Sequence, residues 1–201
     1  AVVQELCPDL NIIFSTNKLS NQHLNYLYNI ADVTINLASN EGFGLGTCES
    51  LMCGTPIIVN VTGGMQDQCG FEYKGKHLDY TDYSWVESLH DWRKWKDNQD
   101  LTHGEWVKPV WPKTRTLAGS PPTPYIFDDR ADWVEVSDTI QYWYDMGKEQ
   151  RDECGFKGHE WVCGDESMMS ARAMCGLFID HMGVALDKWT PRKRFELMEV
   201  K

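Results

Sequence analysis

Glu41 and Glu49 are the two residues whose type and spacing point most directly to chemistry. Seven residues separate them, and three of those seven are glycines, at positions 42, 44 and 46. Glycine lets the backbone approach a phosphate without a Cβ in the way, and a following helix would point free N–H groups at the charge. A carboxylate accepts two hydrogen bonds, which suits the vicinal hydroxyls of a sugar. The run is therefore expected to bind a diphosphate and two sugar rings.

The two glutamates are not expected to act as a general acid and base pair. Glu41 lies in the predicted loop and Glu49 about one turn into the predicted helix, on either side of the phosphate cradle. One is thus placed for the transferred sugar and the other for the ribose. A helical Glu is usually only a solvated residue, and a lone G-x-G is a weak signal. The flanking strands and the Gly54-Thr55-Pro56 ending make the combination specific.

The Gly-rich run with its two glutamates lies within a predicted alternation of strands and helices. Apolar runs predict buried strands at 11–15, 32–37 and 57–60. Between them, Ser20 is a predicted N-cap, and a second helix is expected over 46–53. This order favours an α/β fold with a parallel sheet flanked by helices, and right-handed crossovers put the Gly-rich loop at the carboxyl edge of the sheet.

The alternation stops after Gly70. We interpret 71–124 as an insertion rich in Trp and Pro, and Pro124 to Phe127 as a possible return to strand. Helices are expected over 132–146 and, more weakly, 148–162. Met168 to Leu186 is apolar around most of its circumference, which predicts a well-buried helix.

Tryptophan is concentrated in the insertion. Trp85 and Trp92, with Leu89, fit one face of a short helix. Aromatic faces can stack on sugars, so an acceptor platform is one interpretation, and packing of the insertion onto the domain is the favoured one. Five of the nine tryptophans lie there: Trp85, Trp92, Trp95, Trp106 and Trp111.

Composition narrows the class of partner. The chain has 201 residues, 42% of them apolar, and a net charge of −11, so a duplex nucleic-acid partner is excluded for lack of a basic face. The seven cysteines form no C-x-x-C pair, which favours buried free thiols in a cytoplasmic protein over zinc ligands. No apolar stretch is long enough for a membrane span, and the basic run 192–194 allows at most peripheral membrane contact.

The run from Glu41 to Glu49 resembles the E-x7-E signature of the family 4 (group 1) retaining glycosyltransferases. The similarity extends to Leu27–Val33 before the loop, to Glu49–Ile58 after it and to Thr62–Gly64. It covers residues 11–70 well and 124–190 loosely. Two departures stand inside the motif: Ser50 replaces the usual Ala, and Ala38 stands where Pro is common.

The resemblance implies a Rossmann-like domain, the C-terminal, donor-binding half of a GT-B fold. It assigns Glu41 to the hydroxyls of the transferred sugar, as the catalytic-site residue, and Glu49 to the ribose. It implies no metal and no cofactor besides a nucleotide-sugar donor. The backbone that would face the sugar and diphosphate comprises Gly42, Phe43, Gly44 and Leu45, and the base would lie at Ser15, Thr16, Asn17 and Lys18.

The expected donor is a UDP- or GDP-sugar, and the expected acceptor a sugar, a lipid-linked acceptor or a protein. Residues 1–201 would form one nucleotide-sugar-binding domain that begins in mid-protein, without the N-terminal acceptor domain, and would not catalyse transfer alone. Two alternatives stay open at this point. A GT-B nucleotide-sugar epimerase shares the fold and a ribose-binding Glu, and a non-catalytic nucleotide-sugar-binding module would need only this half.

Overall fold

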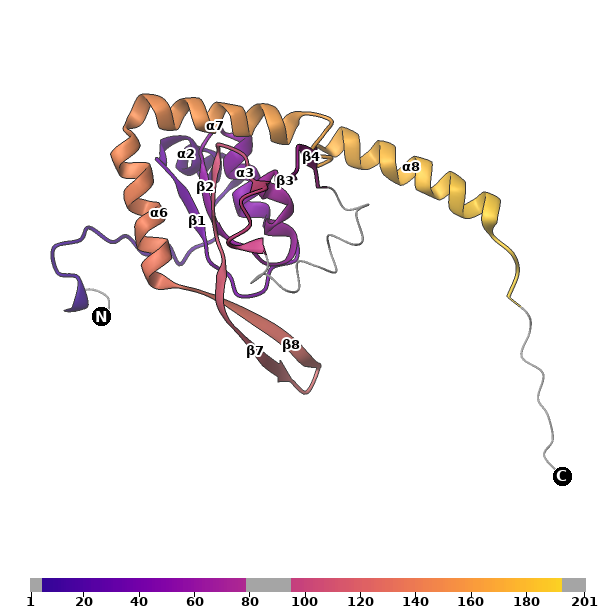
Figure 1. Ribbon diagram of the computed structural model, residues 1–201, viewed down its shortest axis with the longest axis horizontal. Coiled ribbons are helices and arrows are strands. Elements are labelled where there is room, and N and C mark those ends of the chain that lie inside the picture. The colour runs from indigo at the N-terminus through magenta and orange to yellow at the C-terminus, as the bar shows by residue number, and fades with distance from the viewer. Residues whose placement is uncertain (1–4, 79–94, 193–201) are drawn as a thin grey trace.

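A parallel sheet of three short strands lies at the centre of the computed structural model, which describes residues 5–78 and 95–192 (Figure 1). The strands are β1 (Thr34–Asn36), β2 (Ile57–Asn60) and β6 (Val107–Val110), in the order β1-β2-β6. Every residue of β2 is buried, as expected of a central strand in a sheet covered on both faces. The predicted parallel α/β arrangement is confirmed.

Helices cover both faces of this sheet. On one face, Ile57 and Val59 pack with Leu51 of α3 (Leu45–Met52) and with Val162. Val162 belongs to α7 (Lys148–Cys163). Successive residues of a strand point to opposite faces, so the residue between Ile57 and Val59 packs into a second cluster.

That second cluster centres on Ile58 and Val110. Val136 and Trp143 of α6 (Trp133–Met146) pack against them. The two clusters give the sheet a core on each side, with α3 and α7 on one and α6, joined by Cys154 of α7, on the other.

Local capping explains why the helix predictions succeed. Ser20 caps α2 (Asn21–Ile30) by accepting from His23 N, and the Asp132 side chain caps α6 by accepting from Val134 N. Gly54 follows α3 with a φ of +78°, the left-handed conformation expected of a helix-ending glycine.

The predicted strand at 11–15 is wrong. None of these residues pairs in a sheet of the described ranges, and the Ile13 side chain is 85% exposed. A strand forms only where a neighbouring edge takes up its N–H and C=O groups, and an apolar run does not supply that neighbour.

Segment 71–124 contains a strand of the central sheet. Besides β6, it holds a small antiparallel sheet, ordered β4-β3-β5, and the first half of a hairpin. The short strands are β3 (Glu72–Tyr73), β4 (Lys76–His77) and β5 (Leu101–Thr102). The βα rhythm is interrupted here, because the described part of the segment ahead of β6 contains these short antiparallel strands.

The described tryptophans of this segment pack onto the domain, as favoured from sequence. Trp106 stacks on Trp161 of α7 with ring centroids 4.9 Å apart, and Trp95 lies edge-on to Tyr73 at 5.1 Å. Trp111 is buried. The helix predicted around Trp85, Leu89 and Trp92 lies outside the described residues.

A hairpin of β7 (Pro112–Ser120) and β8 (Thr123–Ala131) projects from the body (Figure 1). The predicted return to strand at 124–127 is confirmed, although the strand pairs only with β7.

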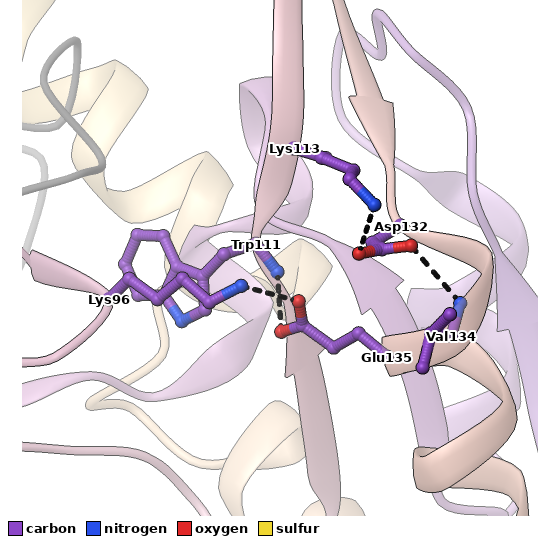
Figure 2. A network of polar contacts seen from close by, with 6 residues as sticks. All are labelled: Lys96, Trp111, Lys113, Asp132, Val134 and Glu135. Carbon is purple, nitrogen blue, oxygen red and sulfur yellow. Dashed lines mark hydrogen bonds and ion pairs between the residues drawn. The ribbon is translucent and has the colours of Figure 1, made fainter.

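The first turn of α6 holds the hairpin's inner end (Figure 2). Asp132 forms an ion pair with Lys113 at 2.8 Å. Glu135 accepts a hydrogen bond from Trp111 N at 3.2 Å and pairs with Lys96 at 2.6 Å. The junction of β6 and β7 is thereby fixed to the helix that covers the sheet.

The prediction of a well-buried helix over 168–186 is also wrong. Helix α8 (Ala171–Lys188) forms, but none of its residues is buried, and it extends beyond the rest of the fold (Figure 1). A helix that is apolar on all sides is stabilised when other residues pack around it. The described residues provide little such packing for α8. Among the described helices, none is long and apolar enough to cross a membrane.

The cysteines are all free thiols, as expected. Cys48, Cys69 and Cys154 are buried, and burial raises the pKa of Cys48 to about 11. The expectation of burial is wrong for Cys163 and Cys175, which are exposed.

Candidate functional site

The loop between β1 and α3 lies at the carboxyl edge of the parallel sheet. Two short 3-10 turns, η1 (Gly63–Met65) and η2 (Asp67–Cys69), follow β2 at the same edge. Parallel strands end on one side, so these segments meet there.

Helix α3 begins with an open N-terminus. Gly44 is the N-cap, with a φ of +82° and no side-chain cap, and the first backbone bond of the helix runs from Cys48 N to Gly44 O at 3.1 Å. Within the described part of the chain, the N–H groups of Leu45, Gly46 and Thr47 have no hydrogen-bond acceptor. Three free donors at the positive end of a helix form a site for an anion.

The buried Gln68 side chain fixes the conformation of the loop. Its Nε2 donates to Phe43 O at 2.6 Å and to Gly44 O at 2.9 Å. In a trans peptide the N–H points opposite to the C=O, so Gly44 N and Leu45 N face away from Gln68. Sequence reasoning missed Gln68, because no local signal pairs it with carbonyls 24 and 25 residues earlier.

Gly63 and Gly64 allow the second loop to lie directly against the first. A Cβ on Gly63 would stand 1.7 Å from Glu41 O, and one on Gly64 would stand 2.5 Å from Gly42 O. Gly64 N donates to Glu41 O at 3.3 Å and Gly42 O at 3.1 Å. The glycine pair is therefore required by contact between backbones.

Glu41 is half-buried beside this contact. Its Oε1 accepts from Gly42 N at 3.1 Å, so the carboxylate folds back over the Gly-rich loop. Its main chain meets η1, and its side chain lies over the loop that precedes α3.

Glu49 lies on the other side of α3, facing α2. Tyr28 donates its hydroxyl to Glu49 Oε2 at 3.2 Å. Burial and the Glu49 carboxylate raise the pKa of Tyr28 to about 12, so its hydroxyl is a donor at neutral pH. A cavity of about 300 Å³ opens there, lined by Asn21, Leu24, Asn25, Tyr28, Glu49, Met52 and Cys53.

Ser50, the departure from the usual Ala, is fully buried and satisfied. Its hydroxyl donates to Thr34 Oγ1 at 2.8 Å and is 3.2 Å from Thr55 O. It joins α3 to β1, so a polar side chain is accommodated within the motif.

The predicted site residues fall into three places. Glu41 to Gly44 form the loop at the open end of α3, Leu45 is the first residue of that helix, and Glu49 lines the cavity against α2. Ser15, Thr16, Asn17 and Lys18 are exposed residues ahead of α2, and in the described ranges no hydrogen bond joins them to either glutamate.

A second cavity, of about 410 Å³, opens beside Phe43. Its lining is mostly apolar and comes from the loop, from η2 and from the start of α8; it includes Asp67, His77, Met168 and Phe178. Among the described residues, no group of His, Cys, Asp and Glu side chains could hold a metal ion.

Comparison with known protein families finds a match over the part of the chain that contains this site. Residues 5–101 match the family described as glycosyl transferases group 1. The matched range contains the loop, both glutamates, α3 and the glycine pair. No curated protein matches the chain.

Proposed function

Residues 5–101 of the chain belong to the glycosyl transferases group 1, and on that premise we propose how this domain holds its donor. The family consists of retaining glycosyltransferases, and a domain of this kind binds the nucleotide sugar. The proposal concerns which residues bind each part of that donor. It is carried by the open N-terminus of α3, which has a glutamate on either side.

The diphosphate would lie against the free N–H groups of Leu45, Gly46 and Thr47. The protein carries a net charge of −11, so the attraction has to come from nearby dipoles rather than from the overall field. In transfer, the bond between the sugar's anomeric carbon and the phosphate oxygen breaks, a bond to the acceptor oxygen forms on the same face, and the proton of the acceptor hydroxyl passes to the departing diphosphate. These N–H groups would stabilise the charge left on the departing diphosphate.

Glu41 would accept hydrogen bonds from the hydroxyls of the transferred sugar, and Glu49 from the ribose. The position of Glu49 in a cavity beside α2 supports the second role, since residues 15–18 lead into that helix. The base would then lie near Ser15–Lys18, next to the ribose. Tyr28 keeps the Glu49 carboxylate turned toward the cavity.

The fold supports a Rossmann-like C-terminal half of a GT-B enzyme as the architecture. The sheet continues through β6, so we take 71–106 and the β7–β8 hairpin as additions around it, within one domain. The acceptor is proposed as a sugar, lipid-linked or protein hydroxyl. Membership of the family favours glycosyl transfer over epimerisation or a non-catalytic binding role.

Calorimetric titration of nucleotide sugars into the purified chain tests the assignment. UDP-glucose, UDP-N-acetylglucosamine, UDP-galactose and GDP-mannose form the panel. For the tightest of them, Glu49→Gln should raise Kd roughly 10- to 150-fold, because a charged hydrogen-bond acceptor is worth about 1.5–3 kcal/mol. Glu160→Gln, at an exposed glutamate of α7, is the matched control and should leave Kd unchanged.

An unchanged Kd in Glu49→Gln would remove the ribose assignment. Failure of all of these sugars to bind the wild-type chain would contradict the donor-binding proposal itself.

A further inference from the structure

The carbonyl oxygen of Gly44 accepts three hydrogen bonds at once. Gln68 Nε2 and Thr47 Oγ1 each donate to it at 2.9 Å. The third bond comes from Cys48 N at 3.1 Å and is the only one that the helix itself requires. The Gln68 and Thr47 side chains are buried, so their hydrogen bonds are electrostatically stronger than they would be in water.

The N–H of the same peptide group belongs to Leu45, the first residue of α3. Hydrogen bonds accepted by a carbonyl draw electron density from its peptide nitrogen, and bonds linked in this way strengthen one another by about 10–30% each. In the described ranges, no side chain donates to the carbonyl of Leu45 or Gly46, the peptide groups whose N–H groups come next. The Leu45 N–H is therefore the strongest donor at the open end of α3.

Gln68 also fixes the direction in which this donor points. Its Nε2 bonds to Phe43 O and to Gly44 O, so both carbonyls are turned inward and the N–H groups of Gly44 and Leu45 are turned outward. Gly44 has a φ of +82°, as in the backbone turns that gather successive N–H groups around an anion.

The position of Gln68 is itself fixed by an aromatic pair. Trp106 Nε1 donates to Gln68 O at 3.0 Å, and the Trp106 ring stacks on Trp161 of α7. Gly70 leaves room for this ring, since a Cβ there would stand 2.6 Å from it. A side chain held in this way reaches the loop from a rigid part of the fold.

Stability alone does not account for a glutamine at this position. Gln68 Oε1 is buried and receives no hydrogen bond from the residues that the structure describes. A buried acceptor without a donor offsets much of what the two Nε2 bonds contribute, and an apolar side chain of similar shape would avoid that cost. Orientation of the loop is a role that only the amide can perform.

We propose that Gln68 is a positioning residue for donor binding. Together with Thr47 Oγ1, it orients and polarises the peptide group between Gly44 and Leu45, whose N–H then binds the diphosphate. This inference rests on the proposed function, which assigns the diphosphate to the open end of α3. It adds that the Leu45 N–H contributes more than its neighbours, and that side chains which never touch the donor set its strength.

Titration of UDP and GDP into the full chain, followed by calorimetry and by ¹⁵N-HSQC spectra, tests the proposal. Gln68→Met keeps the length of the side chain without its donor, and Thr47→Val keeps the shape without the hydroxyl. Each should raise the Kd of the tighter nucleotide about 3- to 10-fold, because a hydrogen bond to a charged group is weakened but not removed. Before nucleotide is added, each should also move the Leu45 ¹⁵N signal upfield, since the peptide group is less polarised.

Two further variants separate this role from a purely structural one. Thr47→Ser keeps the hydroxyl and should lose less affinity than Thr47→Val. Thr139→Val is the matched control, because Thr139 Oγ1 donates to Val136 O at 2.7 Å, the same contact three residues back, in α6 on the other face of the sheet. It should leave both the Kd and the Leu45 signal unchanged.

Kd values equal to that of the wild type in Gln68→Met and Thr47→Val would overturn the proposal, as would an equal loss in Thr139→Val or an unmoved Leu45 signal. If Gln68→Met does not fold, equal Kd values in Thr47→Val and Thr47→Ser overturn it by themselves. Any of these results, with UDP or GDP bound by the wild type, leaves the donor proposal standing. A wild-type chain that binds neither nucleotide would contradict both proposals.

Discussion

At the scale of single residues, the site needs glycine at different positions for different physical reasons. Gly44 adopts a left-handed backbone conformation, and a Cβ there would meet Met65, Thr47 and Gln68. Gly64 has an ordinary conformation but no room, because backbone atoms of the neighbouring loop lie where its Cβ would be. The first shapes the start of α3, and the second sets how closely the two loops approach.

Substitution of Gly64 tests this difference directly. Gly64→Ala should destabilise the chain by about 1–3 kcal/mol, the usual cost of overpacking, because the obstructing atoms are main-chain atoms that cannot rotate away. Gly176→Ala in α8, where no atom lies within 4 Å, should instead stabilise by up to about 1 kcal/mol. Urea unfolding at neutral pH measures both changes, and a Gly64→Ala variant as stable as the wild type would contradict the packing described.

The candidate site is predictable from sequence only in its local part. The spacing of Glu41 and Glu49 and the glycines between them lie within one short run. The side chains that support them do not: Tyr28 reaches Glu49 from 21 residues away, and Gln68 reaches the loop carbonyls from 24 and 25 residues away. Such contacts depend on which segments the fold brings together, and a single sequence carries no mark of them.

At the scale of helices and strands, the elements that depend on contacts close in sequence were predicted correctly, and those that depend on distant contacts were not. Helices α2 and α6 have caps within a few residues and were predictable. The strand at 11–15 and the burial of α8 depended on partners elsewhere, and both expectations failed. Strand β6 was missed because its pairing with β2 joins residues about 50 positions apart, as in the register Ile57 with Val107.

Asp129 is the residue that makes the hairpin part of the domain. Asp129→Asn should destabilise the chain by about 3 kcal/mol, because the half-buried Arg115 guanidinium loses its negative partner. Asp128→Asn, its neighbour on the opposite face of β8, should change stability by less than about 0.5 kcal/mol. Chemical unfolding of both variants gives the comparison, and equal stabilities would mean that the ion pair does not hold the hairpin.

At the scale of the whole molecule, an acidic protein is proposed to bind an anionic ligand. The net charge of −11 opposes this binding at long range, while the open end of α3 favours it at short range. The affinity should therefore depend on a few backbone N–H groups at one sheet edge. The family match of residues 5–101 indicates the class of ligand, and from the geometry of α3 we propose where the charge of that ligand is held.

A ¹⁵N-HSQC titration with the tightest-binding nucleotide sugar tests that claim most directly. The account predicts that the amide signals of Leu45, Gly46 and Thr47 shift most, together with those of the Gly42–Gly44 loop, as each N–H gains a phosphate acceptor. Saturable shifts centred elsewhere, such as the cavity beside Phe178, with the α3 amides unmoved, would contradict it.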